Sequence, residues 1–244
     1  MKRIIIVGAT SGIGREVALS YIAAGYKVGI AGRRIETLKE MQSEAPHAVE
    51  IEQIDVTSID AGKALLRLIE KIGGMDIFLL SSGVGSQNLQ LDPDIELETA
   101  NTNVVGFTRM VDTAFNYFKQ YKTGHIAVIS SIAGTKGLGS APAYSATKRF
   151  QNTYIDALSQ LSHMEKLGIR FTDVRPGFVA TALLKDQSYP MLMRTGYVAS
   201  HIIRALENRK RVVVIDWKYA ILVFFWWLIP RFLWERLPIR NDKR

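Results

Sequence analysis

The sequence predicts an α/β fold, a single doubly wound parallel sheet with helices on both faces, followed by a hydrophobic, basic C-terminal tail. Three observations predict it. Short β-branched segments alternate with longer amphipathic segments along most of the 244 residues. Several short segments are apolar at consecutive positions, as in strands that are buried on both faces. A glycine-rich turn directly follows the first short segment.

Seven strands are expected in chain order, at residues 4–7, 27–31, 49–54, 76–80, 125–130, 169–174 and 211–215. Six helices are expected between them, at residues 12–24, 35–44, 58–72, 94–120, 143–167 and 197–207. Gly25 and Gly73-Gly74 stand where helix C-caps are expected. Asp92 and Pro93 suit the N-cap and first position of a helix. This alternation implies βαβ crossovers in one layered domain.

Composition excludes several classes of protein. With 48% hydrophobic and 22% charged residues, the chain is not expected to be disordered. It has no cysteine, which excludes disulfides, Cys-ligated metals and a thiol nucleophile. Four scattered histidines give no metal-ligand spacing, so no metal site is expected. The first apolar run is too short for a secretory signal, and a cytoplasmic location is expected.

The C-terminal segment differs from the rest of the chain. Residues 209–244 hold nine Lys or Arg, three acidic residues and all four Trp, so they carry +6 of the net charge of +8. The apolar run at 219–229 is shorter than the about 20 residues that a spanning helix needs. Residues 1–215 are therefore expected to form one domain, and residues 216–244 a separate tail.

Two interpretations of this tail remain open. Trp beside Lys and Arg fits a peripheral contact of residues 217–237 with the inner face of a membrane. The alternative is a helix packed in a homo-oligomer, a dimer or a tetramer. Nucleic acid is not an expected partner, because the basic residues interleave with too many apolar ones.

The glycine-rich turn predicts a dinucleotide site. Its sequence, Gly-Ala-Thr-Ser-Gly-Ile-Gly, lies between a buried strand and a helix N-terminus, so its backbone can approach a pyrophosphate. A purely structural tight turn is the alternative. The candidate contacts are Gly8, Thr10, Ser11, Gly12, Ile13 and Gly14.

The end of the second strand indicates which dinucleotide binds. Arg33 and Arg34 stand there without a carboxylate. An acidic residue would suit the ribose hydroxyls of NAD, whereas arginine can pair with a 2′-phosphate. NADP(H) is therefore favoured over NAD(H), although two solvated surface arginines are the simpler alternative.

A candidate catalytic group lies midway along the chain. Tyr144 and Lys148 are four residues apart, so they share one face of a helix. The ammonium is expected to stabilise the phenolate and to lower the pKa of Tyr144, which would then act as acid or base. Ser131 follows an apolar strand, at the sheet edge where ligands bind. Taken alone, the Tyr-Lys pair could be a surface pair.

The ordered motifs resemble those of the short-chain dehydrogenase/reductase family of about 250 residues, with its Rossmann-type fold. The resemblance covers residues 1–215, which are therefore expected to form a dinucleotide-binding and catalytic domain. The resemblance implies a catalytic tetrad of Asn103, Ser131, Tyr144 and Lys148. It implies further cofactor contacts at Asp55, Val56, Ser82, Gly83, Tyr144, Lys148, Pro176, Gly177, Val179 and Thr181. Residues 80–83 depart from the family's Asn-Asn-Ala-Gly motif, because both asparagines are lost and only the glycine is kept.

The resemblance also implies a reaction, reversible hydride transfer between NADPH and a ketone or secondary alcohol. Tyr144 would exchange the proton, Ser131 would polarise the carbonyl, and Lys148 would hold the nicotinamide ribose. Asn103 would position a water in a proton relay to Lys148. The family's mobile substrate lid corresponds to residues 182–193, whose Leu and Met side chains suit a lipid-like carbonyl substrate. The alternatives are a small polar metabolite or a non-catalytic nucleotide-sensing module.

Overall fold

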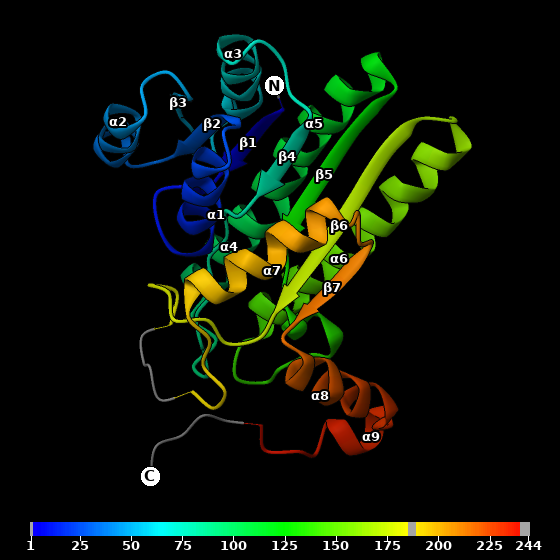
Figure 1. The fold of residues 1–244 in the computed structure, drawn as a ribbon. Helices are drawn as coiled ribbons and strands as arrows, with labels where there is room; N and C mark the ends of the chain where they lie inside the picture. Colours follow the sequence, from blue (N-terminus) through cyan, green and yellow to red (C-terminus); the bar gives the residue numbers. More distant parts are fainter. Residues whose placement is uncertain (1, 185–188, 240–244) are drawn as a thin grey trace.

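The computed structural model describes residues 2–184 and 189–239 and has a parallel sheet at its centre (Figure 1). Seven strands lie in the order β3-β2-β1-β4-β5-β6-β7, and all neighbouring pairs are parallel. The predicted fold class is confirmed, and each expected strand is present. The strands are β1 (Arg3–Val7), β2 (Lys27–Gly32), β3 (Val49–Gln53), β4 (Ile77–Leu80), β5 (Thr123–Ile129), β6 (Gly168–Pro176) and β7 (Val212–Ile215).

Helices cover both faces of this sheet, because the side chains of its strands alternate between two cores. Ile5 and Val7 of β1 face one apolar cluster, and Ile4 and Ile6 face the other. The first cluster lies under α3 (Ala61–Lys71), α5 (Phe107–Tyr121) and α6 (Pro142–Met164), and the second lies under α1 (Gly12–Ala23), α2 (Ile35–Glu44) and α7 (Thr195–Glu207).

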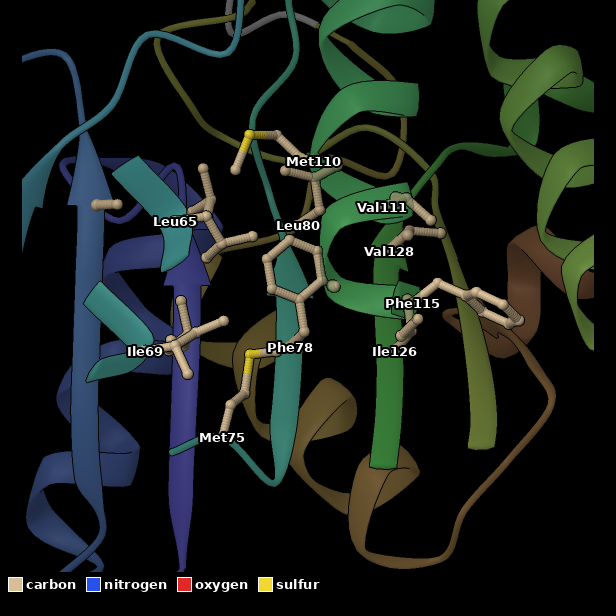
Figure 2. Close-up of a cluster of buried hydrophobic side chains, with 14 of the residues drawn as sticks. Leu65, Ile69, Met75, Phe78, Leu80, Met110, Val111, Phe115, Ile126 and Val128 are labelled. Atoms are coloured by element: carbon tan, nitrogen blue, oxygen red, sulfur yellow. The ribbon is translucent and has the colours of Figure 1, made fainter. Parts of the chain in front are cut away.

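Figure 2 shows part of the first cluster. Leu65 of α3 and Met110 of α5 project toward Phe78 of β4, which is fully buried. Each fully buried side chain of this kind contributes about 1.5–3 kcal/mol relative to an exposed one. The cluster therefore fixes α3 and α5 on β4 and β5, whose carboxyl ends carry site residues.

The helix expected at residues 94–120 is present, but it contains a π-helical turn that the sequence did not predict. The chain forms α4 (Pro93–Ala100), a π-helical turn at Asn101–Gly106 and then α5. Asp92 does cap α4, because its carboxylate accepts a hydrogen bond from the Asp94 amide at 3.0 Å. The inserted turn rearranges backbone hydrogen bonds around Asn103, and such turns often occur at functional sites.

The C-terminal tail forms two short helices, α8 (Trp217–Leu228) and α9 (Arg231–Trp234). Figure 1 shows them beyond the carboxyl ends of β6 and β7. Tyr219 is fully buried and Trp234 is nearly so. Among the described residues, no helix combines the length and apolarity that crossing a bilayer requires. Residues 240–244 of the expected tail, and residues 185–188 of the expected lid, lie outside the described residues.

Candidate active site

The site lies at the carboxyl edge of the sheet, where the strand order reverses. β1 lies between β2 and β4, so the chain leaves β1 toward one side and later returns on the other. Ligands of open α/β sheets bind outside the carboxyl ends of strands at such a switch point. The glycine-rich turn follows β1 there, and Ser131 follows β5.

The turn after β1 needs glycine for its own packing. Gly8 has a φ of +91°, and a Cβ on it would lie 2.6 Å from the Ser82 amide nitrogen. Gly14 lies so close to the Gly8 carbonyl that no Cβ fits between them. A Cβ on Gly12 would lie 3.2 Å from Thr181 Cγ2, so the turn also abuts the segment after β6. This packing places Ser82 and Thr181 on either side of the turn.

The N-terminus of α1 is suited to an anion. Ser11 is its N-cap and makes no side-chain capping bond, and its first turn contains no acidic residue. The free amides and the positive end of the helix dipole therefore remain available. Together with the bare glycine backbone, this donor set fits the pyrophosphate of a dinucleotide.

The second-strand end presents two exposed arginines. Arg34 donates from Nε and Nη2 to Thr10 Oγ1, at 3.2 and 2.9 Å. Asp55 accepts from the hydroxyl and the amide of Thr57, and these bonds lower its pKa, with a smaller contribution from Arg33. Val56 is buried beside it. The residues predicted to hold the adenosine half therefore lie together at the carboxyl ends of β2 and β3. Two exposed arginines at this position suit a 2′-phosphate.

Tyr144 and Ser131 meet at the other half of the edge. The Tyr144 ring lies against Gly85, where any side chain would clash with it. Burial raises the pKa of Tyr144, and a hydrogen bond with Ser131 opposes that rise. The pKa of Tyr144 therefore lies above its ordinary value, where the sequence had predicted a lowered one. Ser131 is buried, and its Oγ accepts from the Ala133 amide at 3.1 Å.

The position of the Lys148 ammonium explains why the pKa of Tyr144 is not lowered. Its Nζ lies 5.7 Å from the centroid of the Tyr144 ring and donates instead to Ile129 O and Gln151 Oε1, both at 3.1 Å. Burial lowers the pKa of Lys148 to about 8, and the charge of buried Asp173 opposes that shift. An ammonium held in this way titrates close to neutral pH and faces the tyrosine ring without bonding to its hydroxyl.

The π-helical turn positions Asn103. Its Nδ2 donates to Val84 O at 2.6 Å and to Thr147 Oγ1 at 3.2 Å, and its Oδ1 accepts from the Val84 amide at 2.9 Å. The side chain therefore fixes the loop after β4. Its backbone carbonyl accepts from Gln151 Nε2 at 2.9 Å.

Gln151 thus links the Asn103 carbonyl to the Lys148 ammonium through its side-chain amide. The sequence reasoning missed it, although its position three residues after Lys148 places both on one helix face. Gly83 closes the same corner, because a Cβ there would lie 3.3 Å from Asn103 Oδ1 and 3.5 Å from Lys148 Nζ.

The segment after β6 forms the remaining wall. The Pro176 carbonyl accepts from Ser131 Oγ at 3.5 Å, and Val179 forms an isolated bridge with Met193. Gly177 lies against the Tyr219 ring of α8. The sequence reasoning did not assign Tyr219 to this region, since nothing in an apolar run singles out one residue as its anchor. Within the described ranges, no three His, Asp or Glu side chains cluster as metal ligands would.

Comparisons with known proteins agree with this geometry. A family model described as short chain dehydrogenase matches residues 2–191. An uncharacterized oxidoreductase of Myxococcus xanthus is 32% identical over 225 residues, covering 89% of this chain and 88% of the relative. Dehydrogenase/reductase SDR family member 7B of Mus musculus is 29% identical over 266 residues, covering 98% and 81%.

Solved structures share the fold. ElxO with NADP bound has a TM-score of 0.78 at 24% identity and covers 90% of this chain and 98% of its own. A variant of actinorhodin polyketide ketoreductase with NADPH has a TM-score of 0.76 at 21% identity and covers 88% and 95%. The family model covers most of the chain, and the Myxococcus relative exceeds 30% identity over nearly all of it. The chain therefore belongs to the short chain dehydrogenase family and is an oxidoreductase enzyme.

Proposed function

We propose that this enzyme transfers hydride reversibly between NADPH and a ketone or secondary alcohol. One observation carries the proposal: Ser131, Tyr144, Lys148 and Asn103 converge at the sheet edge that also holds the glycine-rich turn. The first three side chains supply a polarising hydroxyl, a proton and a positive charge. Asn103 fixes the loop after β4 and, through Gln151, reaches Lys148.

Each proposed role follows from the local geometry. Bound NADPH supplies a hydride for the carbonyl carbon. Tyr144 donates its hydroxyl proton to the carbonyl oxygen, and its raised pKa keeps it protonated for reduction at neutral pH. Ser131 hydrogen-bonds that oxygen and stabilises its developing negative charge. Lys148, whose Nζ lies 5.7 Å from the centroid of the Tyr144 ring, would stabilise the developing phenolate electrostatically. In oxidation the proton returns to Tyr144.

We propose NADP(H) as the cofactor because Arg33 and Arg34 flank the rim where a 2′-phosphate would lie. Gly8, Thr10, Ser11, Gly12, Ile13 and Gly14 would hold the pyrophosphate, and Asp55 with Val56 the adenine. Ser82, Gly83, Pro176, Gly177, Val179 and Thr181 would line the nicotinamide half. The NADP in the ElxO structure and the NADPH in the ketoreductase structure support this choice.

We propose a lipid-like carbonyl as the substrate. Apolar side chains of the lid support this, since Leu183 and Met191 are both over 40% exposed. Peripheral contact of the tail with the inner face of a membrane is part of the same proposal, and a homo-oligomer contact through the tail is its alternative. The exposed apolar residues on α8 and α9 support both, because patches of this kind mark interaction sites.

The test uses Tyr144→Phe, which removes the proton donor and keeps the ring. NADPH oxidation should fall by about 10²–10⁴-fold over a panel of ketones, from small polar to long-chain ones. NADPH binding, measured by fluorescence titration, should be retained. Tyr154→Phe is the matched control, since that hydroxyl lies on the same helix and donates to Asp112. Full turnover by Tyr144→Phe, or equal use of NADH, would contradict the respective part of the proposal.

A further inference from the structure

The face formed by α8, α9 and the next residues exposes large apolar side chains. Nine of them, all within residues 217–237, are 45–71% exposed. They are Trp217, Ile221, Phe224, Phe225, Trp227, Leu228, Phe232, Leu233 and Leu237. Within the described chain, the other exposed large apolar side chains are scattered over many elements. A patch this dense on one surface indicates a partner that covers it.

A cationic groove runs along one side of α8. Its volume is about 650 Å³, and one wall is the apolar side of α8, formed by Ala220, Val223, Phe224 and Trp227. The other wall is polar and holds three cations, Lys136, Arg149 and Arg175, beside Thr135. The groove therefore places positive charge directly against aromatic surface. This combination fits a ligand with an anionic head and an apolar tail.

The three cations are not equally neutralised. Arg175 pairs with the buried carboxylate of Asp173 at 2.7 Å. Lys136 Nζ donates to the neutral carbonyl of Ile229 at 2.8 Å and keeps its charge. Arg149 is exposed, and no carboxylate of the described residues lies within 4.0 Å of it. Two uncompensated positive charges thus remain in the groove.

We infer that this groove binds the phosphate headgroup of an anionic phospholipid, while the exposed apolar side chains of α8 and α9 enter the bilayer. Trp and Phe suit the interface between headgroups and acyl chains. Each basic residue near an anionic membrane surface contributes about 1 kcal/mol. A second copy of the chain fits less well, because a two-fold interface centred on the groove would face its positive charges with those of the partner's groove.

The same helices contact the end of the lid segment and the loop after β5. Tyr219 Oη lies 3.1 Å from the Pro190 and Met191 carbonyls at the end of the lid segment. Trp234 Nε1 donates to the Gly137 carbonyl at 2.7 Å. Membrane docking of α8 and α9 would therefore bring the end of the lid segment close to the bilayer. This step rests on the proposed function and assigns the substrate to the lipid phase.

The experiment is flotation of the full chain with vesicles of phosphatidylcholine, with and without phosphatidylglycerol. The wild-type protein should float with the anionic vesicles, and added salt should weaken the binding. Arg149→Glu should weaken it about tenfold or more, because it reverses one of the two free charges. Arg170→Glu is the control: it makes the same charge change at an exposed position near the amino end of β6. Trp227→Ser should weaken binding to both kinds of vesicle.

Two results would overturn the inference. If Arg149→Glu and Arg170→Glu float equally well, the groove does not bind the lipid headgroup. Absence of flotation, together with a dimer that Trp227→Ser converts to monomer, would show that a second copy covers the face. NADPH turnover over the whole panel of ketones, from small polar to long-chain ones, is measured on the same preparations and separates this inference from the proposed function. Retained turnover without flotation refutes membrane docking alone, whereas absent turnover refutes the reductase assignment.

Discussion

At the scale of single residues, Gln151 decides how the buried ammonium of Lys148 is held. Lys148 has a pKa of about 8 because it is buried, so its charge is sensitive to each hydrogen-bond acceptor around it. Gln151 supplies one of its two protein acceptors and, from the other end of its amide, satisfies the Asn103 carbonyl. It therefore acts as a positioning residue for the proposed reaction.

Gln151→Leu should lower kcat/KM several-fold and narrow its pH range. Loss of an acceptor disfavours the charged form of Lys148, so activity should disappear at a lower pH on the alkaline side than in the wild type. Gln151→Glu should move that limb to higher pH, because a carboxylate favours the ammonium. The pH profile of kcat/KM reports on the free enzyme and is the measurement. Gln42→Leu, which removes a remote glutamine bonded to the Val49 carbonyl, should leave the profile unchanged.

At the scale of elements, β5 and β6 hold a buried histidine at the edge of the sheet opposite the site. His125 Nε2 lies 2.8 Å from Thr172 Oγ1, and that hydroxyl donates to the Lys210 carbonyl. The Thr172 proton is therefore used, and Nε2 must be the donor to Thr172. Burial lowers the pKa of His125 to about 4, with additional repulsion from Arg170 and Arg209. The pairing of these strands thus includes a group that resists protonation.

Acid should weaken the pairing of β5 with β6 around His125. The folded pKa of about 4 lies below the ordinary value of 6.5, so the unfolded chain binds the proton first as the pH falls. Stability due to neutral His125 is complete above pH 6.5 and is lost between pH 6.5 and 4, by about 3 kcal/mol in total. Urea unfolding at both pH values should show a loss of this size in excess of that in His125→Gln. An equal loss of stability in the wild type and in His125→Gln would disprove the role of His125. The control His47→Gln, at an exposed position, should behave as wild type.

At the scale of the whole molecule, the division between residues 1–215 and 216–244 stays a prediction. Tyr219 joins the core on the α1 side of the sheet, so the tail contributes to the stability of the body. Removal of the residues after Asp216 should lower the free energy of unfolding by about 3–5 kcal/mol, as loss of other large buried aromatics does. It should also lower Tm by roughly 10 °C. Calorimetry measures this directly. The control Trp227→Ser should leave Tm nearly unchanged, because that ring is 71% exposed. An unchanged Tm in the truncated chain would instead show that the tail is separable from the body.

Most of the fold could be predicted from the sequence, because buried parallel strands are apolar at consecutive positions and glycines mark the turns. All seven strands could be predicted in this way. The convergence of Ser131, Tyr144 and Lys148 was predicted from the Tyr-Lys spacing, the strand end before Ser131 and the family resemblance. The π-helical turn could not, since residues 101–106 have ordinary helical patterning and the interruption depends on tertiary bonds of Asn103. The pKa of Tyr144 also escaped prediction, because spacing shows that Lys148 is near but not where its ammonium points.

The contact between Gly177 and Tyr219 has an evolutionary consequence. The tyrosine ring occupies the space that a side chain at position 177 would need, so the two positions constrain each other's size. Relatives with a side chain at the position of Gly177 should therefore carry a smaller residue in place of Tyr219, or should lack the tail altogether. Covariation of these two positions across the family would then mark which members hold their C-terminal helices against the site.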